Sequence, residues 1–153
     1  MFTINISMIR LLFLVLLASC LPQNKRERVS LSKTENALNF INNYVENCNK
    51  KKQSIDVVKW VKSSDLVTTD FKDELKKVMY EASKKEPAVG LDAYPLFNAQ
   101  YYPDKGFELD SFEEKSNYLV VKGKNLPEFK VTMKIVNENK KWLVDGCGLI
   151  RVP

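Results

Sequence analysis

The chain has 153 residues, with 24 Lys and Arg against 19 Asp and Glu, and a formal net charge of +5. This length fits one domain with a single core, and the lysines are spread in short pairs, which argues against a nucleic-acid partner. Histidine is absent. Because histidine is the commonest general base and a frequent zinc ligand, most hydrolase and zinc-enzyme classes are disfavoured, and we expect no cofactor.

The first predicted element is an apolar run, residues 11–17, that lies between Arg10 and the sequence Ala18-Ser19-Cys20. A basic residue, a short apolar run and small residues are typical of a secretory signal peptide, and the run is shorter than the roughly 20 residues that span a bilayer. The junction resembles a bacterial lipobox, in which the cysteine is diacylated and the preceding peptide is removed. We therefore expect a signal peptide over residues 1–19 and a membrane anchor on Cys20.

Residues 20–31 are polar, carry Pro22 and lack an apolar period, so a flexible tether is expected there. The domain itself is expected over residues 32–153. Among lipoproteins an acidic residue after the cysteine favours the inner membrane. Leu21 stands at that position, which favours the outer membrane. Acidic surface-export signals are missing just after Cys20, which favours a domain that faces the periplasm.

Three helices are predicted in the first half of the domain. A capping box at Ser32–Glu35 opens the first, whose apolar residues recur every three or four positions as far as Cys48. Ser54 is the predicted N-cap of a short second helix. The third runs from residues 69–70 to the residues before Pro87, with acids at its start and lysines at its end.

The second half of the domain changes pattern. Residues 88–106 fit neither a helix nor a strand period and predict a long, aromatic-rich loop. Apolar and polar residues then alternate, which predicts strands beginning at Phe107, Tyr118, Phe129 and Lys141. Three helices followed by an antiparallel meander of about four strands predict an α+β domain, with the helices packed on one face of the sheet.

Several motifs of the domain form a recognisable set. They are Trp60, Gly90–Ala93, Pro95, Asn98–Gln100, Tyr102–Pro103 and the closing Lys141–Gly146. This set is similar to a family of small bacterial lipoproteins classed as a domain of unknown function, and the resemblance spans roughly Ser32 to Val152. It implies a nuclear-transport-factor-like (cystatin-like) fold, in which a curved sheet wraps a long helix to form a cone. Acids often stand in that family where this chain has Tyr94 and Tyr101, and no activity is implied.

Cys48 and Cys147 remain once Cys20 carries a lipid. Two cysteines outside the reducing cytosol predict a disulfide, which would close a loop of about 100 residues and contribute about 3–5 kcal/mol. The alternative is a pair of buried free thiols that behave as small apolar residues.

The candidate pocket or interface residues are Trp60, Asp92, Tyr94, Gln100, Tyr101 and Asp145. Asp92 could act as a proton-abstracting base beside a tyrosine at the mouth of the cone, or it could bond loop amides while the tyrosines cover the core. The aromatic side chains Phe97, Tyr101 and Tyr102 could bind a partner protein, or they could pack as part of the core under the long loop. The acids around Asp104 do not match a calcium-binding loop, so no metal site is predicted.

These patterns favour a non-catalytic binding or protein-interaction module, held in the bacterial cell envelope by the lipid on Cys20. Its expected partners are the membrane and an envelope protein. Two alternatives stay open: a periplasmic inhibitor or immunity protein, and a small cone-pocket enzyme that uses Asp92.

Overall fold

The computed structural model describes residues 23–85 and 93–153, with side chains of the first helix described from residue 33 onward. The described helices are α2 (Gln23–Asn49), the 3-10 helix η1 (Lys51–Gln53), α3 (Val57–Ser63) and α4 (Thr69–Lys85). The strands are β1 (Phe107–Glu113), β2 (Tyr118–Gly123), β3 (Lys130–Glu138) and β4 (Lys141–Cys147). The described part of the chain is therefore α+β, as its sequence predicts.

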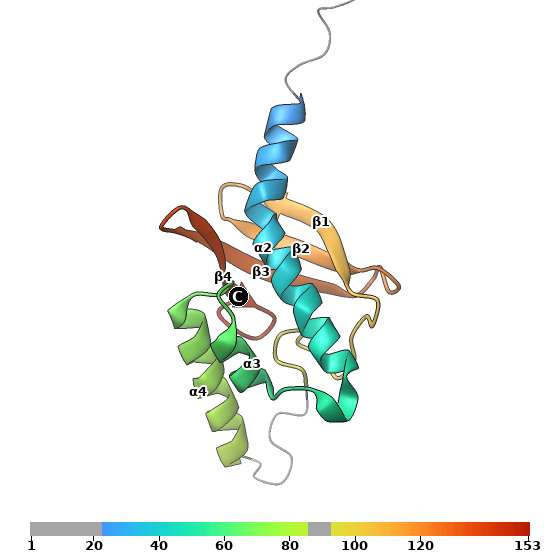
Figure 1. Ribbon diagram of the computed structural model, residues 1–153, viewed down its shortest axis with the longest axis vertical. Helices are drawn as coiled ribbons and strands as arrows, with labels where there is room; N and C mark the ends of the chain where they lie inside the picture. The colour runs from blue at the N-terminus through green and yellow to red at the C-terminus, as the bar shows by residue number, and fades with distance from the viewer. Residues whose placement is uncertain (1–22, 86–92) are drawn as a thin grey trace, which may run out of the picture.

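The four strands form one antiparallel sheet in the order β1-β2-β3-β4. Helix α2 crosses one face of this sheet diagonally, and α3 and α4 lie together beside β4 (Figure 1). The turn between β3 and β4 places Asn139 and Lys140 at φ values of 50° and 67°. A hairpin turn with two left-handed residues matches the right-handed twist of its strands, and asparagine tolerates that conformation well.

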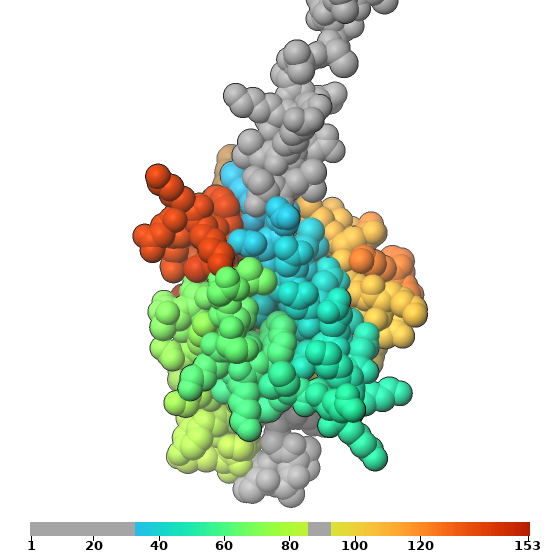
Figure 2. Space-filling view, in the orientation of Figure 1, coloured from blue at the N-terminus to red at the C-terminus, as the bar shows by residue number. Residues whose placement is uncertain are grey.

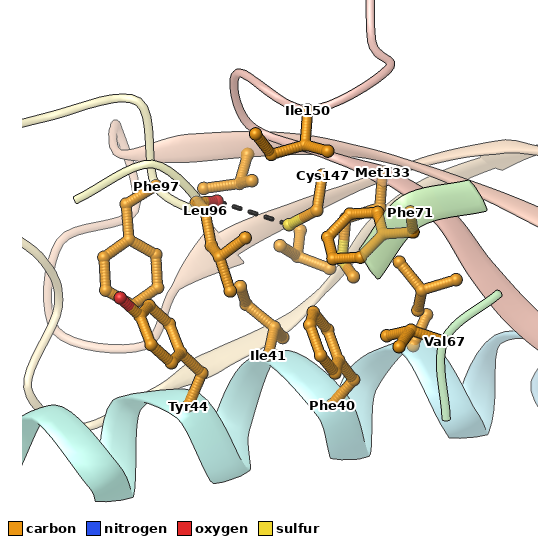
Figure 3. Close-up of a cluster of buried hydrophobic side chains, with 14 of the residues drawn as sticks. Phe40, Ile41, Tyr44, Val67, Phe71, Leu96, Phe97, Met133, Cys147 and Ile150 are labelled. Atoms are coloured by element: carbon orange, nitrogen blue, oxygen red, sulfur yellow. Dashed lines mark hydrogen bonds between the residues drawn. The ribbon is translucent and has the colours of Figure 1, made fainter. Parts of the chain in front are cut away.

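The core lies between α2 and the sheet (Figure 3). Phe40, Ile41 and Tyr44 point from α2 toward the strands, where Met133 and Cys147 are fully buried. Each fully buried large apolar side chain contributes about 1.5–3 kcal/mol to stability. The three- and four-residue spacing along α2 and the alternation along β3 therefore account for the layer arrangement.

The structure differs from the predicted helix starts at two places. Helix α2 begins at Gln23, so residues 23–31 of the predicted tether are helical and the proposed capping box lies inside the helix. This segment follows Pro22, contains no further proline or glycine, and is rich in Gln, Lys, Arg, Glu and Leu, which favour helix. In α3 the N-cap is Asp56 rather than Ser54. The Asp56 carboxylate accepts hydrogen bonds from the backbone N–H groups of Val58 and Lys59.

Candidate functional site

Asp145 occupies a β-bulge in β4. Ile135 of β3 pairs with Val144, and Lys134 pairs with Gly146, so Asp145 is the extra residue without a partner in the ladder. Such a bulge changes the direction of a side chain and bends the strand. Asp145 is buried, with 5% of the residue exposed, so its carboxylate needs partners inside the protein.

Three side chains supply those partners. The Thr68 hydroxyl donates a hydrogen bond to Asp145 Oδ1 at 3.0 Å. Lys134 Nζ and Arg151 Nη2 lie 3.2 and 3.3 Å from Asp145 Oδ2. Arg151 also lies 3.5 Å from the Asp70 carboxylate in the first turn of α4. Both oxygens of the buried carboxylate are therefore engaged, and we name this group of residues the Asp145 cluster.

The Asp145 cluster ties several elements together. The Thr68 hydroxyl oxygen accepts a hydrogen bond from Phe71 N at 3.1 Å, which caps the start of α4. The backbone of Thr68 donates to Val144 O at 3.0 Å, and Val144 N donates to Leu66 O at 2.9 Å. The segment before α4 therefore covers the edge of β4. The cluster joins α4, β3, β4 and the C-terminal residues, and its geometry is that of a structural ion-pair network.

Trp60 and Tyr94 belong to a continuous series of packed aromatic rings. The ring centroid of Trp60 lies 5.1 Å from that of Tyr44, and Tyr44 lies 5.0 Å from Phe97. Phe97 lies 5.8 Å from Tyr94, and Tyr94 lies 5.0 Å from Tyr102. These distances are typical of favourable aromatic packing. The rings of Trp60 and Tyr94 thus cover the core. Phe97, 2% exposed, lies within the core, so its prediction as a partner-binding side chain is wrong.

Tyr101 has a different environment. It is 63% exposed, and its ring meets the Phe129 ring edge-on at a centroid distance of 5.2 Å. The neighbouring Gln100 is also exposed. The hydroxyl of Tyr102 donates to Asn49 Oδ1 at 3.2 Å, so this loop is held against the C-terminal end of α2. Tyr101 therefore presents an aromatic surface at that end.

Cys48 and Cys147 are free thiols in the structure, so the predicted disulfide is not present. Cys147 is fully buried, and its thiol donates to the carbonyl oxygen of Leu96 at 3.2 Å. Cys48 is half-buried beside Tyr44; burial raises the pKa of its thiol to about 11, although the hydrogen bond with Tyr44 opposes this shift. Burial also raises the pKa of Cys147. The two thiols have separate partners and match the alternative of small apolar residues.

The structure distributes the predicted site residues over three places. Asp145 lies in its ion cluster, Trp60 and Tyr94 lie in the aromatic series, and Gln100 and Tyr101 lie on the surface; Asp92 is outside the described residues. Sequence reasoning missed Thr68, Lys134 and Arg151. The sequence shows only that Lys134 lies on the polar side of an alternating strand. This pattern does not predict that its partner is the Asp145 carboxylate on the next strand.

Within residues 33–85 and 93–153, no three His, Cys, Asp or Glu side chains are grouped so that they could hold a metal ion. Among the described helices, none combines the length and the apolar character needed to cross a bilayer. No family model, no curated protein and no solved structure matches this chain.

Proposed function

We propose that this chain is a lipid-anchored, non-catalytic module of a bacterial envelope that binds a protein partner. The observation that carries this proposal is the position of α2. The helix begins at Gln23, directly downstream of the lipobox-like Cys20, and continues as far as Asn49 through the centre of the domain. A lipid on Cys20 would therefore act at one end of the core helix.

The two ends of α2 have different surroundings. Its 27 residues correspond to a length of about 40 Å at 1.5 Å per residue. The N-terminal end projects beyond the sheet (Figure 1), whereas the C-terminal end carries Asn49, which is bonded to Tyr102. With the N-terminal end at a membrane, the exposed Tyr101 would lie at the opposite end, available to a partner. Exposed tyrosines are common anchors of protein interfaces.

The proposal includes a nuclear-transport-factor-like cone, with α2 as the helix that the sheet surrounds. Two observations support this finer description. Helix α2 packs against β1, β3 and β4, so it contacts both edges of the sheet. Bulges at Asp110 in β1 and at Asp145 in β4 interrupt the ladder in both edge strands, and bulges bend strands and increase twist. The proposed location in the outer membrane depends on Leu21 next to Cys20, and the proposed periplasmic face depends on the missing acidic residues just after Cys20.

The anchor is tested by membrane fractionation and labelled palmitate. Wild type should fractionate with membranes and incorporate label, and Cys20→Ser should do neither. A Cys20→Ser variant that stays with membranes would contradict the anchor.

The interaction is tested by crosslinking in intact envelopes. Tyr101→Ala should weaken capture of a defined crosslinked partner. Tyr80→Ala is the matched control, because Tyr80 is 57% exposed on α4, and it should capture the partner normally. Equal capture by both variants would remove Tyr101 from the proposal. A captured lytic enzyme or toxin that loses its activity on binding would identify the inhibitor alternative.

A further inference from the structure

Three segments that are far apart in the sequence meet at the C-terminal end of α2. They are residues 50–55, 101–105 and 124–125, and we name them together the distal surface. Asn49 donates to Asp104 O at 2.9 Å, and Asn125 donates to Asp104 Oδ1 at 2.8 Å. Lys105 N donates to Asn125 Oδ1 at 3.3 Å. These bonds, together with that from Tyr102 to Asn49, hold the three segments in one place.

The distal surface is rich in unpaired positive charge. Its five lysines are Lys50, Lys51, Lys52, Lys105 and Lys124, all exposed. Within the described part of the chain, no carboxylate forms an ion pair with any of them. The Asp104 carboxylate inside the surface is bonded to Asn125.

The lysines of the sheet behave differently. Lys130 Nζ lies 2.7 Å from Asp110, Lys122 lies 3.6 Å from the same carboxylate, and Lys134 lies 3.2 Å from Asp145. Each of these sheet lysines therefore has an acidic partner within the chain. The contrast indicates that the distal surface, unlike the sheet, has positive charge left for an external partner.

Two exposed apolar side chains lie at the same end of the molecule. Ile55 is 50% exposed and Tyr101 is 63% exposed. The side chain of Asn47 bonds both the N–H and the carbonyl of Ile55, at 2.9 and 2.8 Å, and so fixes its position after α2. The teal segment that follows α2 projects outward at the lower right of the space-filling view (Figure 2). An interface that combines apolar anchors with a charged rim is typical of protein recognition.

We propose that the distal surface docks an acidic segment of a partner protein. This inference rests on the proposed function, because it identifies the chemistry of the partner expected there. The partner's Asp and Glu side chains would face the lysines, and its apolar side chains would contact Ile55 and Tyr101. The anchoring membrane is not the occupant, because Cys20 precedes the other end of a helix about 40 Å long. Charge of this kind mainly accelerates association and makes binding sensitive to salt.

The test uses the full acylated chain in detergent and a fluorescent peptide rich in Glu and Asp that carries one Leu and one Tyr. Binding is followed by anisotropy at low and high salt. The test variant is Lys50→Glu/Lys52→Glu/Lys105→Glu. The matched control, Lys76→Glu/Lys115→Glu/Lys140→Glu, makes the same change in net charge at other exposed lysines. Thermal melts of both variants establish that they fold.

We expect salt-sensitive binding by the wild type, a loss of affinity of about tenfold or more in the test variant, and a change of about twofold or less in the control. Tyr101→Ala should also weaken binding. Equal losses in both triple variants would overturn the inference, because they would show that only net charge matters. No peptide binding, or tighter binding of polyphosphate or of vesicles rich in phosphatidylglycerol, would also overturn it. Each of these negative results concerns only peptide binding by the distal surface. The lipid anchor is tested independently, by the membrane fractionation of Cys20→Ser, so one proposal can be wrong while the other holds.

Discussion

Replacing Asp145 by alanine removes the acceptor that Thr68, Lys134 and Arg151 share. Deleting one member of a fully buried ion pair costs about 3–5 kcal/mol, because the other charge is left without a partner. Here the side chains of Lys134 and Arg151 are 32% and 33% exposed, so both cations can turn toward water. The buried Thr68 hydroxyl has less freedom and loses its acceptor, at a cost of about 1–3 kcal/mol.

We therefore expect Asp145→Ala to lower the free energy of unfolding by about 2–3 kcal/mol, which corresponds to a fall in Tm of about 5–10 °C. Urea titration followed by circular dichroism measures this change, and the slope of the transition should stay constant. Asp145→Asn keeps an acceptor for Thr68 and should cost less. Asp110→Ala is the matched control, because Asp110 is also the extra residue of a bulge and also contacts two lysines.

The control differs from Asp145 chiefly in exposure. The Asp110 side chain is 23% exposed, against 7% for Asp145, and surface ion pairs contribute little. Asp110→Ala should therefore destabilise the protein much less than Asp145→Ala. Two results would refute this reasoning. One is that both variants unfold at the same urea concentration, and the other is that Asp145→Ala changes the free energy of unfolding by less than about 0.5 kcal/mol. Either result would show that burial of Asp145 does not increase the contribution of its ion pairs to stability.

Three other predictions concern single residues. Asn42→Ala should lower the free energy of unfolding by about 2 kcal/mol in urea titration, because this side chain bonds the N–H and the carbonyl of the first residue of β1 at 2.8 and 3.1 Å. Iodoacetamide should modify Cys48 with a pH midpoint near 11 and leave Cys147 unmodified in the folded chain, as read by intact mass. A carbon-detected NMR titration should place the pKa of Asp110 below its ordinary value, because the Lys130 hydrogen bond favours the charged carboxylate. The stability that Asp110 contributes is therefore present above the ordinary pKa and lost as the pH falls through the lowered one, and Asp110→Asn should remove this part of the acid dependence.

Each of these expectations has a contradicting result. Unchanged stability of Asn42→Ala would show that β1 is positioned without these bonds. Resistance of both thiols to iodoacetamide until a reductant is added would restore the predicted disulfide. An ordinary or raised pKa for Asp110 would show that the Lys130 contact does not persist in solution.

Much of the secondary structure depends on local pattern and could be predicted. The recurrence of apolar residues along α2 and α4 and their alternation along β3 are properties of neighbours in sequence, and the structure confirms these elements. The predicted α+β order follows from them. The helix starts were harder to predict. Ser54 and Asp56 are both good caps in isolation, and Ser32 lies inside α2 although its spacing to Glu35 fits a capping box. The choice among such residues depends on what the helix packs against.

The candidate site depended on longer-range contacts. The sequence indicated that Asp145, inside a strand, needs partners, but its bulge arises from the register between β3 and β4, and its contacts come from residues such as Thr68 that are remote in the chain. The same holds for the thiols of Cys48 and Cys147, which lie in packed elements yet face different partners.

The sequence alone therefore determined the order and type of most elements, the total charge and the residue types that could carry chemistry. Only the tertiary structure decided that Asp145 has three partners, that the rings of Trp60 and Tyr94 cover the core, and that lysines from three segments meet at the end of α2. The physical reason is that periodicity reports how a segment buries its own face, whereas pairing between distant side chains depends on strand register and helix packing, to which many residues contribute together.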